Sequence, residues 1–312
     1  MKHTVLLTFF MALTGLSAHA AGYDDKAMQV KEIRLSNGLT VWINEDHSLP
    51  KVFGAVVVKA GAADCPNTGI AHYFEHMMFK GTDKIGTVDY EKERPWLDSI
   101  SAKYDLLAHT ADEATRRQIQ ADINRLGAKA AEYAIPNEFS NLVSRYGGSG
   151  LNAATSLDYT VYYNTFLPQY VDQWASLNSE RLVSPVFRLF QSELETVYEE
   201  KNMYSDNVLM SAYERVMENF FGGTPYAYPI IGSTESLKNP RLSEMQGFYD
   251  RYYVAGNMAL ILAGDLCADS IMPLLERTFG RIRAGEAPAR SEFTPVSLAS
   301  QPEVRLRIPY PI

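Results

Sequence analysis

Cysteine is scarce in this sequence, with only Cys65 and Cys267 among 312 residues. Two thiols cannot form the disulfide framework of a small secreted domain, and alone they do not make a zinc site. A single disulfide between them is compatible with an exported protein, and their spacing neither supports nor opposes it. We interpret each cysteine as a small, buried, apolar residue.

Positive charge and long apolar segments are also limited. The 29 lysine and arginine residues are outnumbered by 37 aspartate and glutamate residues, which gives a formal net charge of −8. This balance argues against a nucleic-acid-binding surface. After the N-terminal leader described next, no stretch is apolar enough to span a membrane. The rest of the chain is long enough to bury a substantial core in one large or two modest domains.

The N-terminal 20 residues have the three regions of a secretory signal peptide. A basic start precedes an apolar run at residues 4–16, and Ala18-x-Ala20 matches a cleavage site after Ala20. The run is too short to cross a bilayer. A buried N-terminal helix is the alternative, but it does not account for all three regions in order. We therefore predict that residues 1–20 are a signal peptide and that the protein is exported, either periplasmic or secreted.

Histidine is rare after this leader, and two of the remaining histidines lie four residues apart. No proline or glycine interrupts residues 70–80, which predicts a helix. On a helix, His72, Glu75 and His76 share one face, because positions three and four apart are neighbours. Two imidazoles and a carboxylate suit a Zn²⁺ site that keeps one position open for water. The order His-x-x-Glu-His is also the inverted signature of zinc metallopeptidases.

The same spacing occurs by chance on solvated helix surfaces. Here the flanking residues favour burial, because the helix also carries Ile70, Phe74 and Met77. Buried imidazoles and carboxylates need polar partners, and a metal ion supplies them. A catalytic zinc ion usually has three protein ligands, so another part of the chain must provide one.

A second predicted helix, at residues 189–203, offers that ligand. It contains no glycine or proline, and Glu193, Val197 and Glu200 fall on one face. The abundance of glutamate in this segment is equally typical of an acidic, solvated surface helix. The apolar Val197 between the two carboxylates instead favours packing against another helix. We therefore expect this face to lie opposite the histidine pair.

The remaining pattern predicts an α+β fold in which a mostly antiparallel sheet is flanked by helices and interrupted by a helical hairpin insert. Asn37-Gly38 predicts a β-hairpin, and residues 52–58 form a β-branched run typical of a central strand. Helical spacing of apolar residues predicts the insert at about residues 87–137. Further expected strands are at 151–155, 159–165, 258–263 and 304–308, and further helices at 170–183, 242–253 and 270–279.

Together these segments resemble the pitrilysin/insulinase family of zinc metallopeptidases, which includes the mitochondrial processing peptidases. The resemblance spans roughly residues 33–279, with the expected fold of the N-terminal catalytic half of that family. It extends to a subgroup of exported bacterial members that carry a similar helical insert. The matching motifs are residues 72–82 (HYFEHMMFKGT), 151–155 (LNAAT), 158–162 (DYTVY) and 193–202, with later matches at 231–233 and 257–264.

The resemblance implies a zinc-dependent endopeptidase that hydrolyses peptides or unfolded polypeptide segments through a metal-activated water. Glu75 would be the general base, and Glu193 would support the ligand network as a second catalytic residue. Glu200 is preferred to Glu199 as a ligand because of its position three residues after Val197. The residues that would bind one Zn²⁺ per chain are then His72, His76 and Glu200. The strand that would bind the peptide substrate carries Asn152 and Ala153.

Family members pair two similar halves around a chamber, and this sequence stops where a second half would begin. We expect residues 21–285 to form the catalytic domain, and residues 286–312 to form a linker and the start of a second, truncated domain. The chain is then a piece of a longer protein or needs a second homologous half as its partner. The alternative function is a non-catalytic, peptide-binding or scaffolding subunit of an active homologue. Such relatives typically lose motif residues that are all present here.

Overall fold

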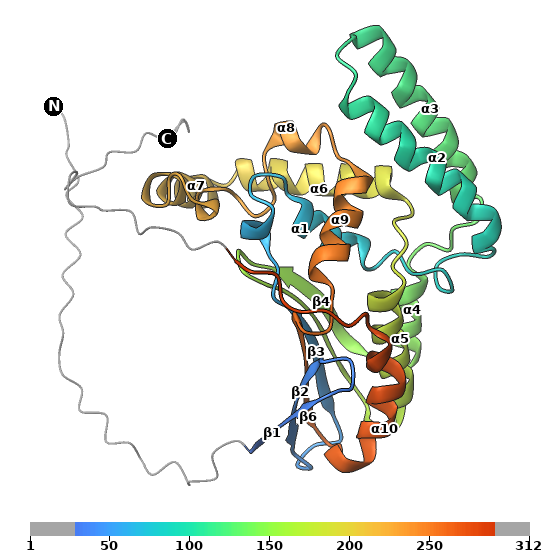
Figure 1. Ribbon diagram of the computed structural model, residues 1–312, viewed down its shortest axis with the longest axis vertical. Coiled ribbons are helices and arrows are strands. Elements are labelled where there is room, and N and C mark those ends of the chain that lie inside the picture. The colour runs from blue at the N-terminus through green and yellow to red at the C-terminus, as the bar shows by residue number, and fades with distance from the viewer. Residues whose placement is uncertain (1–28, 291–312) are drawn as a thin grey trace, which may run out of the picture.

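The computed structural model describes residues 29–290 and is built around a six-stranded sheet (Figure 1). The strand order is β1-β2-β6-β3-β5-β4. Strands β2 and β6 run parallel, and every other neighbouring pair is antiparallel. The predicted α+β fold with a mostly antiparallel sheet is therefore confirmed. The strands are β1 (Val30–Arg34), β2 (Thr40–Glu45), β3 (Val52–Val58), β4 (Ser149–Thr155), β5 (Thr160–Phe166) and β6 (Met258–Gly264).

The β1–β2 hairpin turns at the predicted Asn-Gly pair. Asn37 Oδ1 accepts a hydrogen bond from the Leu39 amide at 3.1 Å. Gly38 has a φ of +94°, which favours glycine because it has no Cβ atom. β3 lies between β6 and β5, so residues 52–58 form the central strand that their composition predicted.

One face of the sheet is covered by α5 (Val171–Val183) and α10 (Ala268–Thr278) (Figure 1). Trp174 of α5 stacks on Phe166 of β5, with ring centroids 4.8 Å apart. The indole also lies directly above β3, because a Cβ atom on Gly54 would be 2.2 Å from it. The two helices correspond to the segments predicted at 170–183 and 270–279, and they bury the inner face of the sheet.

The helix that carries His72, Glu75 and His76, α1 (Ile70–Met77), packs among other helices above one end of the sheet. Phe74 is fully buried there, and the hydroxyl of Tyr73 donates a 2.5 Å hydrogen bond to the carbonyl of Phe190. The helix begins after Gly69 at a φ of +72°, where a Cβ atom would lie 2.3 Å from the carbonyl oxygen of Ile231. The helices in this layer are α1 (Ile70–Met77), α6 (Phe190–Ser205) and α9 (Leu242–Tyr252).

The predicted insert is a pair of helices that projects away from the sheet (Figure 1). Its helices are α2 (Tyr90–Ala108) and α3 (Glu113–Ala131). Glu93 of α2 forms an ion pair with Arg188, and both side chains are at most 1% exposed. This contact attaches the insert to the segment that leads into α6.

Among the described residues, three helices were not predicted from the sequence, namely α4 (Glu138–Arg145), α7 (Val208–Phe220) and the single turn α8 (Thr234–Leu237). α4 begins after Asn137, which has a φ of +58° and provides no side-chain cap. α7 contains no buried residue, so its apolar residues do not form a core-facing stripe. The short elements are α8 (Thr234–Leu237) and the 3₁₀ turns η1 (Ala62–Asp64), η2 (Pro168–Tyr170), η3 (Pro225–Ala227) and η4 (Phe279–Arg281).

Both cysteines are unpaired thiols in the structure. The interpretation of Cys267 as buried is wrong, because it lies at the exposed N-terminal end of α10. Cys65 is partly buried. No helix within residues 29–290 is long and apolar enough to cross a membrane. The predicted signal peptide, the strand at 304–308 and most of the linker lie outside the described residues.

Candidate metal centre

Helices α1 and α6 bring His72, His76 and Glu200 together. The Nε2 atoms of the two histidines lie 3.6 Å and 3.5 Å from the same oxygen of Glu200. One donor atom from each of the three residues can be chosen so that all lie within 4.8 Å of one another. Tetrahedral zinc with bonds of about 2.0–2.1 Å separates its ligand atoms by about 3.3 Å. The arrangement of these donor atoms therefore fits a zinc ion.

Glu193 fixes the orientation of His76. Its carboxylate lies 2.8 Å from His76 Nδ1 and forms an ion pair with Lys80. With Nδ1 occupied in this way, Nε2 of His76 faces Glu200. Metal-ligating histidines are commonly hydrogen-bonded to a carboxylate through the ring nitrogen that does not bind the metal. This contact fixes the tautomer and the orientation of the ring.

The two histidines differ in charge state. Burial, aided by the neighbouring His76, lowers the pKa of His72 to about 4, so its ring is neutral near pH 7. Burial also acts to lower the pKa of His76, but hydrogen bonds with Glu193 and Glu200 outweigh it and raise that pKa to about 9. Within the described residues, Nδ1 of His72 is buried without a hydrogen-bond partner. A neutral ring can offer Nε2, the nitrogen that faces Glu200, to a metal ion.

Glu75 lies beside this cluster and lines the same cavity. Its carboxylate accepts a 2.6 Å hydrogen bond from the Thr155 hydroxyl of β4. Burial raises the pKa of Glu75, despite that hydrogen bond. A carboxylate with a raised pKa is better suited to accept and release a proton near neutral pH. Thr155 and Lys80 were not predicted as site residues, although both lie within matched motifs.

The cavity at the cluster has a volume of about 490 Å³. Asn152 and Ala153 lie in its wall, as predicted for the strand next to the site. Their strand, β4, is at the edge of the sheet, so one side of its backbone is available for pairing. A separate cavity of about 300 Å³ between the insert and the start of α6 has no histidine in its lining.

Two parts of the cavity wall were not predicted from the sequence. Met210, Tyr213 and Met217 of α7 form one part, and residues 227–231 form the other. A usable signal existed, because those three side chains recur at helical spacing and no glycine or proline interrupts residues 190–221. Asn207 also caps α7, accepting hydrogen bonds from the next turn.

The sequence profile of the insulinase family (peptidase family M16) matches residues 40–115 and 123–234, a range that includes the whole candidate centre. The chain belongs to the M16 peptidase family. The gap between the two matched segments falls within α3 of the insert. A second M16 profile, described as the peptidase M16 inactive domain, matches residues 241–309.

Several M16 relatives are similar over most of this chain. The beta subunit of the mitochondrial-processing peptidase from Caenorhabditis elegans is 25% identical over 245 residues, covering 78% of this chain and 42% of that protein. An uncharacterized zinc protease from Rickettsia felis is 23% identical over 266 residues, covering 84% and 52%. The chain therefore spans about half the length of these relatives.

A solved M16 structure has the same fold. The periplasmic protease PqqL from Escherichia coli superposes with a TM-score of 0.65 at 18% identity, over 87% of this chain and 26% of that chain.

Proposed function

We propose that this M16 chain is the metal-binding half of a zinc-dependent endopeptidase. The convergence of His72, His76 and Glu200 around one point, with Glu75 in the same cavity, carries the proposal. In this proposal the first three bind one Zn²⁺ per chain, and Glu193 orients His76 from behind. The relative from Rickettsia felis named as a zinc protease supports the choice of metal.

The chemistry follows from the positions of the side chains. When bound, zinc supplies a Lewis acid that lowers the pKa of a coordinated water and polarises a peptide carbonyl. Glu75 takes a proton from the attacking water and passes it to the leaving amine. Thr155 holds that carboxylate in position through its 2.6 Å hydrogen bond.

The proposed substrate is a peptide or an unfolded segment that pairs with the edge strand β4. Backbone pairing at an edge strand gives affinity with little demand on sequence. Asn152 and Ala153 lie on that strand and in the cavity wall. In this proposal a second homologous half completes the enzyme, because the chain spans about half of its relatives. Export to the periplasm or beyond is also proposed, supported by the leader pattern and by one periplasmic structural neighbour.

A non-catalytic partner subunit is the second candidate. It is favoured by one observation, the match of residues 241–309 to a profile described as an inactive domain. All residues of the candidate centre lie outside that match. The complete set of acidic and imidazole groups therefore favours the enzyme.

The test compares Glu75→Gln with Glu199→Gln, which changes an exposed glutamate on α6. Both proteins are assayed for zinc content and for cleavage of a fluorogenic peptide, with and without a second homologous half. We expect Glu75→Gln to keep zinc and to lose about 10²–10⁴-fold in kcat, and Glu199→Gln to resemble the wild type. Failure of the wild-type chain to bind zinc would refute the proposal. Zinc binding without cleavage by the completed wild-type assembly would favour the scaffolding role.

A further inference from the structure

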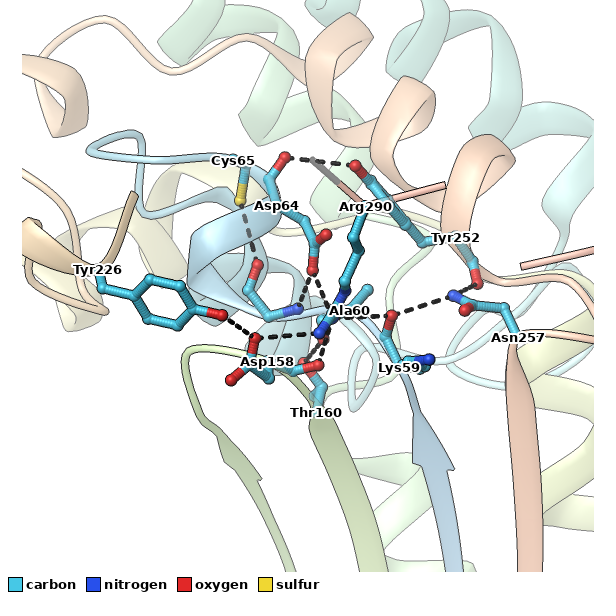
Figure 2. A network of polar contacts seen from close by, with 11 residues as sticks. Lys59, Ala60, Asp64, Cys65, Asp158, Thr160, Tyr226, Tyr252, Asn257 and Arg290 are labelled. Atoms are coloured by element: carbon cyan, nitrogen blue, oxygen red, sulfur yellow. Dashed lines mark hydrogen bonds and ion pairs between the residues drawn. The ribbon is translucent and has the colours of Figure 1, made fainter. Parts of the chain in front are cut away.

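Arg290 joins three segments at one end of the sheet. Its guanidinium donates to the carbonyl of Lys59 at 3.1 Å and to the carboxylates of Asp64 and Asp158, each at 3.0 Å. It also donates to the backbone carbonyl of Asp158 at 2.5 Å. Figure 2 shows the guanidinium between the two carboxylates. These acceptors come from the end of β3, from η1 and from the turn between β4 and β5.

The two carboxylates are held close together by the backbone. The amides of Ala62 and Ala63 in η1 donate to the carbonyls of Ser156 and Leu157 in the β4–β5 turn, at 3.0 Å and 2.8 Å. This packing brings Asp64, with a side chain only 9% exposed, next to the turn. Like charges at such a contact repel each other unless a cation lies between them. The guanidinium supplies that cation and satisfies both carboxylates with charge-assisted hydrogen bonds.

The turn held by Arg290 is directly connected to the cavity at the metal centre. Leu157 precedes Asp158 and lines the cavity. Thr155, at the end of β4, holds the Glu75 carboxylate. A shift of the turn would therefore move both the wall of the cavity and the group that positions the proposed base.

A second wall of the cavity is attached to the same aspartate. The hydroxyl of Tyr226 donates to Asp158 at 2.8 Å (Figure 2). Tyr226 lies in η3, and the residues that follow it, 227–231, line the cavity. Asp158 therefore links Arg290 to the turn on one side and to this loop on the other.

Arg290 itself belongs to the segment that leaves the domain after α10. That segment lies beside the residues that precede β6. The amides of Ala255 and Gly256 donate to the carbonyls of Arg283 and Gly285, each at 2.9 Å. The chain continues beyond Arg290 to residue 312. Arg290 therefore connects the segment that follows α10 to the turn beside the cavity.

We propose that Arg290 is a positioning residue. It holds the β4–β5 turn and the loop at residues 226–231 in the arrangement that binds a peptide. The role rests on the proposed peptidase function. Through this residue, the affinity of the cleft for a peptide depends on the position of the segment that follows α10. Attachment of a second half after that segment would therefore change peptide binding at β4. Zinc binding does not depend on the contacts of Arg290, because none of the proposed zinc ligands contacts this residue.

The test compares Arg290→Ala with Arg283→Ala, a matched control in the same segment whose side chain is paired with Asp250 instead. Amide hydrogen exchange of residues 149–160 and 224–231 is measured on the full chain. In parallel, kcat and KM are measured on a fluorogenic peptide with the second half present. We expect Arg290→Ala to accelerate exchange in both segments and to raise KM about five- to tenfold, with a smaller fall in kcat because the turn adjoins Thr155. Arg283→Ala should change neither.

Lysine at position 290 keeps the charge but cannot engage several acceptors in a fork, so Arg290→Lys should give intermediate exchange rates and an intermediate KM. Unchanged exchange in Arg290→Ala, or a fall in kcat at constant KM, overturns the role. If the wild-type assembly cleaves no peptide, the proposed function fails, while the exchange measurement still decides whether Arg290 holds the two segments. If Arg290→Ala does not fold, Asp158→Asn tests the same contact, with the same expected pattern.

Discussion

Two adjacent glutamates on α6 have very different surroundings. Glu199 is exposed, whereas one oxygen of Glu200 lies 3.5 Å and 3.6 Å from the two histidines. A hydrogen bond from His76 lowers the pKa of Glu200, against the effect of burial. The carboxylate of Glu200 is therefore ionised at neutral pH and ready to bind a cation.

The ligand set is tested by single substitutions. We expect His72→Ala, His76→Ala and Glu200→Ala each to weaken zinc binding by more than about 100-fold, since even the loss of a supporting carboxylate costs about 10–100-fold. Glu193→Gln should fall in that smaller range. Metal content after dialysis against a zinc buffer measures the effect, and Glu199→Ala is the control. Loss of zinc in Glu199→Ala with retention in Glu200→Ala would reverse the assignment.

The charge states of the histidines predict how zinc binding depends on pH. In the metal-free protein at pH 7, His76 is protonated because its pKa is raised to about 9, whereas His72, with a pKa of about 4, is neutral. A metal must displace the proton from His76, so binding at pH 7 should release about one proton. Affinity should rise with pH up to about pH 9 and then level off.

Calorimetric titration in buffers of different ionisation enthalpy counts the released protons. Glu193→Gln provides the comparison, because removal of this partner lowers the pKa of His76 and reduces the release at pH 7. Zinc affinity that stays constant between about pH 6 and pH 8 would contradict the assignment of His76 as the protonated ligand.

At the scale of elements, one buried ion pair helps to hold the insert against the domain. Arg188 donates to both oxygens of Glu93, at 2.9 Å and 3.1 Å. It also donates to three backbone carbonyls in residues 80–85, at 2.7–2.9 Å. The same guanidinium therefore holds α2 and the loop that follows α1.

Removal of Glu93 would leave the charge of Arg188 buried and unpaired. We expect Glu93→Ala to lower the free energy of unfolding by about 3–5 kcal/mol. The neighbouring Arg94 is exposed and weakly paired with Asp98 at 3.7 Å, so Arg94→Ala should cost less than about 1 kcal/mol. Urea denaturation monitored by circular dichroism measures both, and similar small losses in the two variants would argue against the anchoring role of Glu93.

Periodicity predicted most elements that bury a face, but it missed α4, which buries only Phe139 and Val143. Helix α1 and the glutamate face of α6 were predicted because apolar residues mark their buried sides. Helix α7 was missed because none of its apolar side chains is buried in the core. They line the cavity or face solvent, and Leu209 and Tyr213, for example, are 79% and 57% exposed. Pairs such as Glu93 and Arg188 lie 95 positions apart, and no local pattern specifies that they meet. No local pattern specifies the contact of Thr155 with Glu75 either, because these residues lie 80 positions apart.

At the scale of the whole molecule, one side of the domain exposes apolar surface. Trp42 and Phe53 on the outer face of the sheet are 38% and 40% exposed, and α7 adds Leu209, Tyr213 and Phe220. Large exposed apolar side chains that gather on a surface mark an interaction site in many soluble proteins. It agrees with the proposal that a second homologous half covers part of the domain.

We therefore expect residues 21–312 alone to bind zinc but to cleave peptides poorly, because in this proposal the second half supplies contacts that hold the substrate in place. Addition of a second homologous half should raise turnover by about 10²-fold, the scale at which misplacement of a substrate affects rate. Fluorogenic peptide assays with and without that half measure the gain, and sedimentation reports the assembly. Full, chelator-sensitive turnover by the monomer would show that one half is sufficient.

The position of β6 has a consequence for biosynthesis. This strand is the last of the six to be translated, yet it is the one that joins β2 to β3. Until residues 258–264 leave the ribosome, the β1–β2 hairpin and the β3–β5–β4 sheet share no strand pairing, and each has an unpaired edge. Such distant pairing slows folding and leaves edges open to wrong partners. A nascent chain of this protein therefore remains without its complete sheet until residues 258–264 have been synthesised, and chaperones have a long interval in which to bind it.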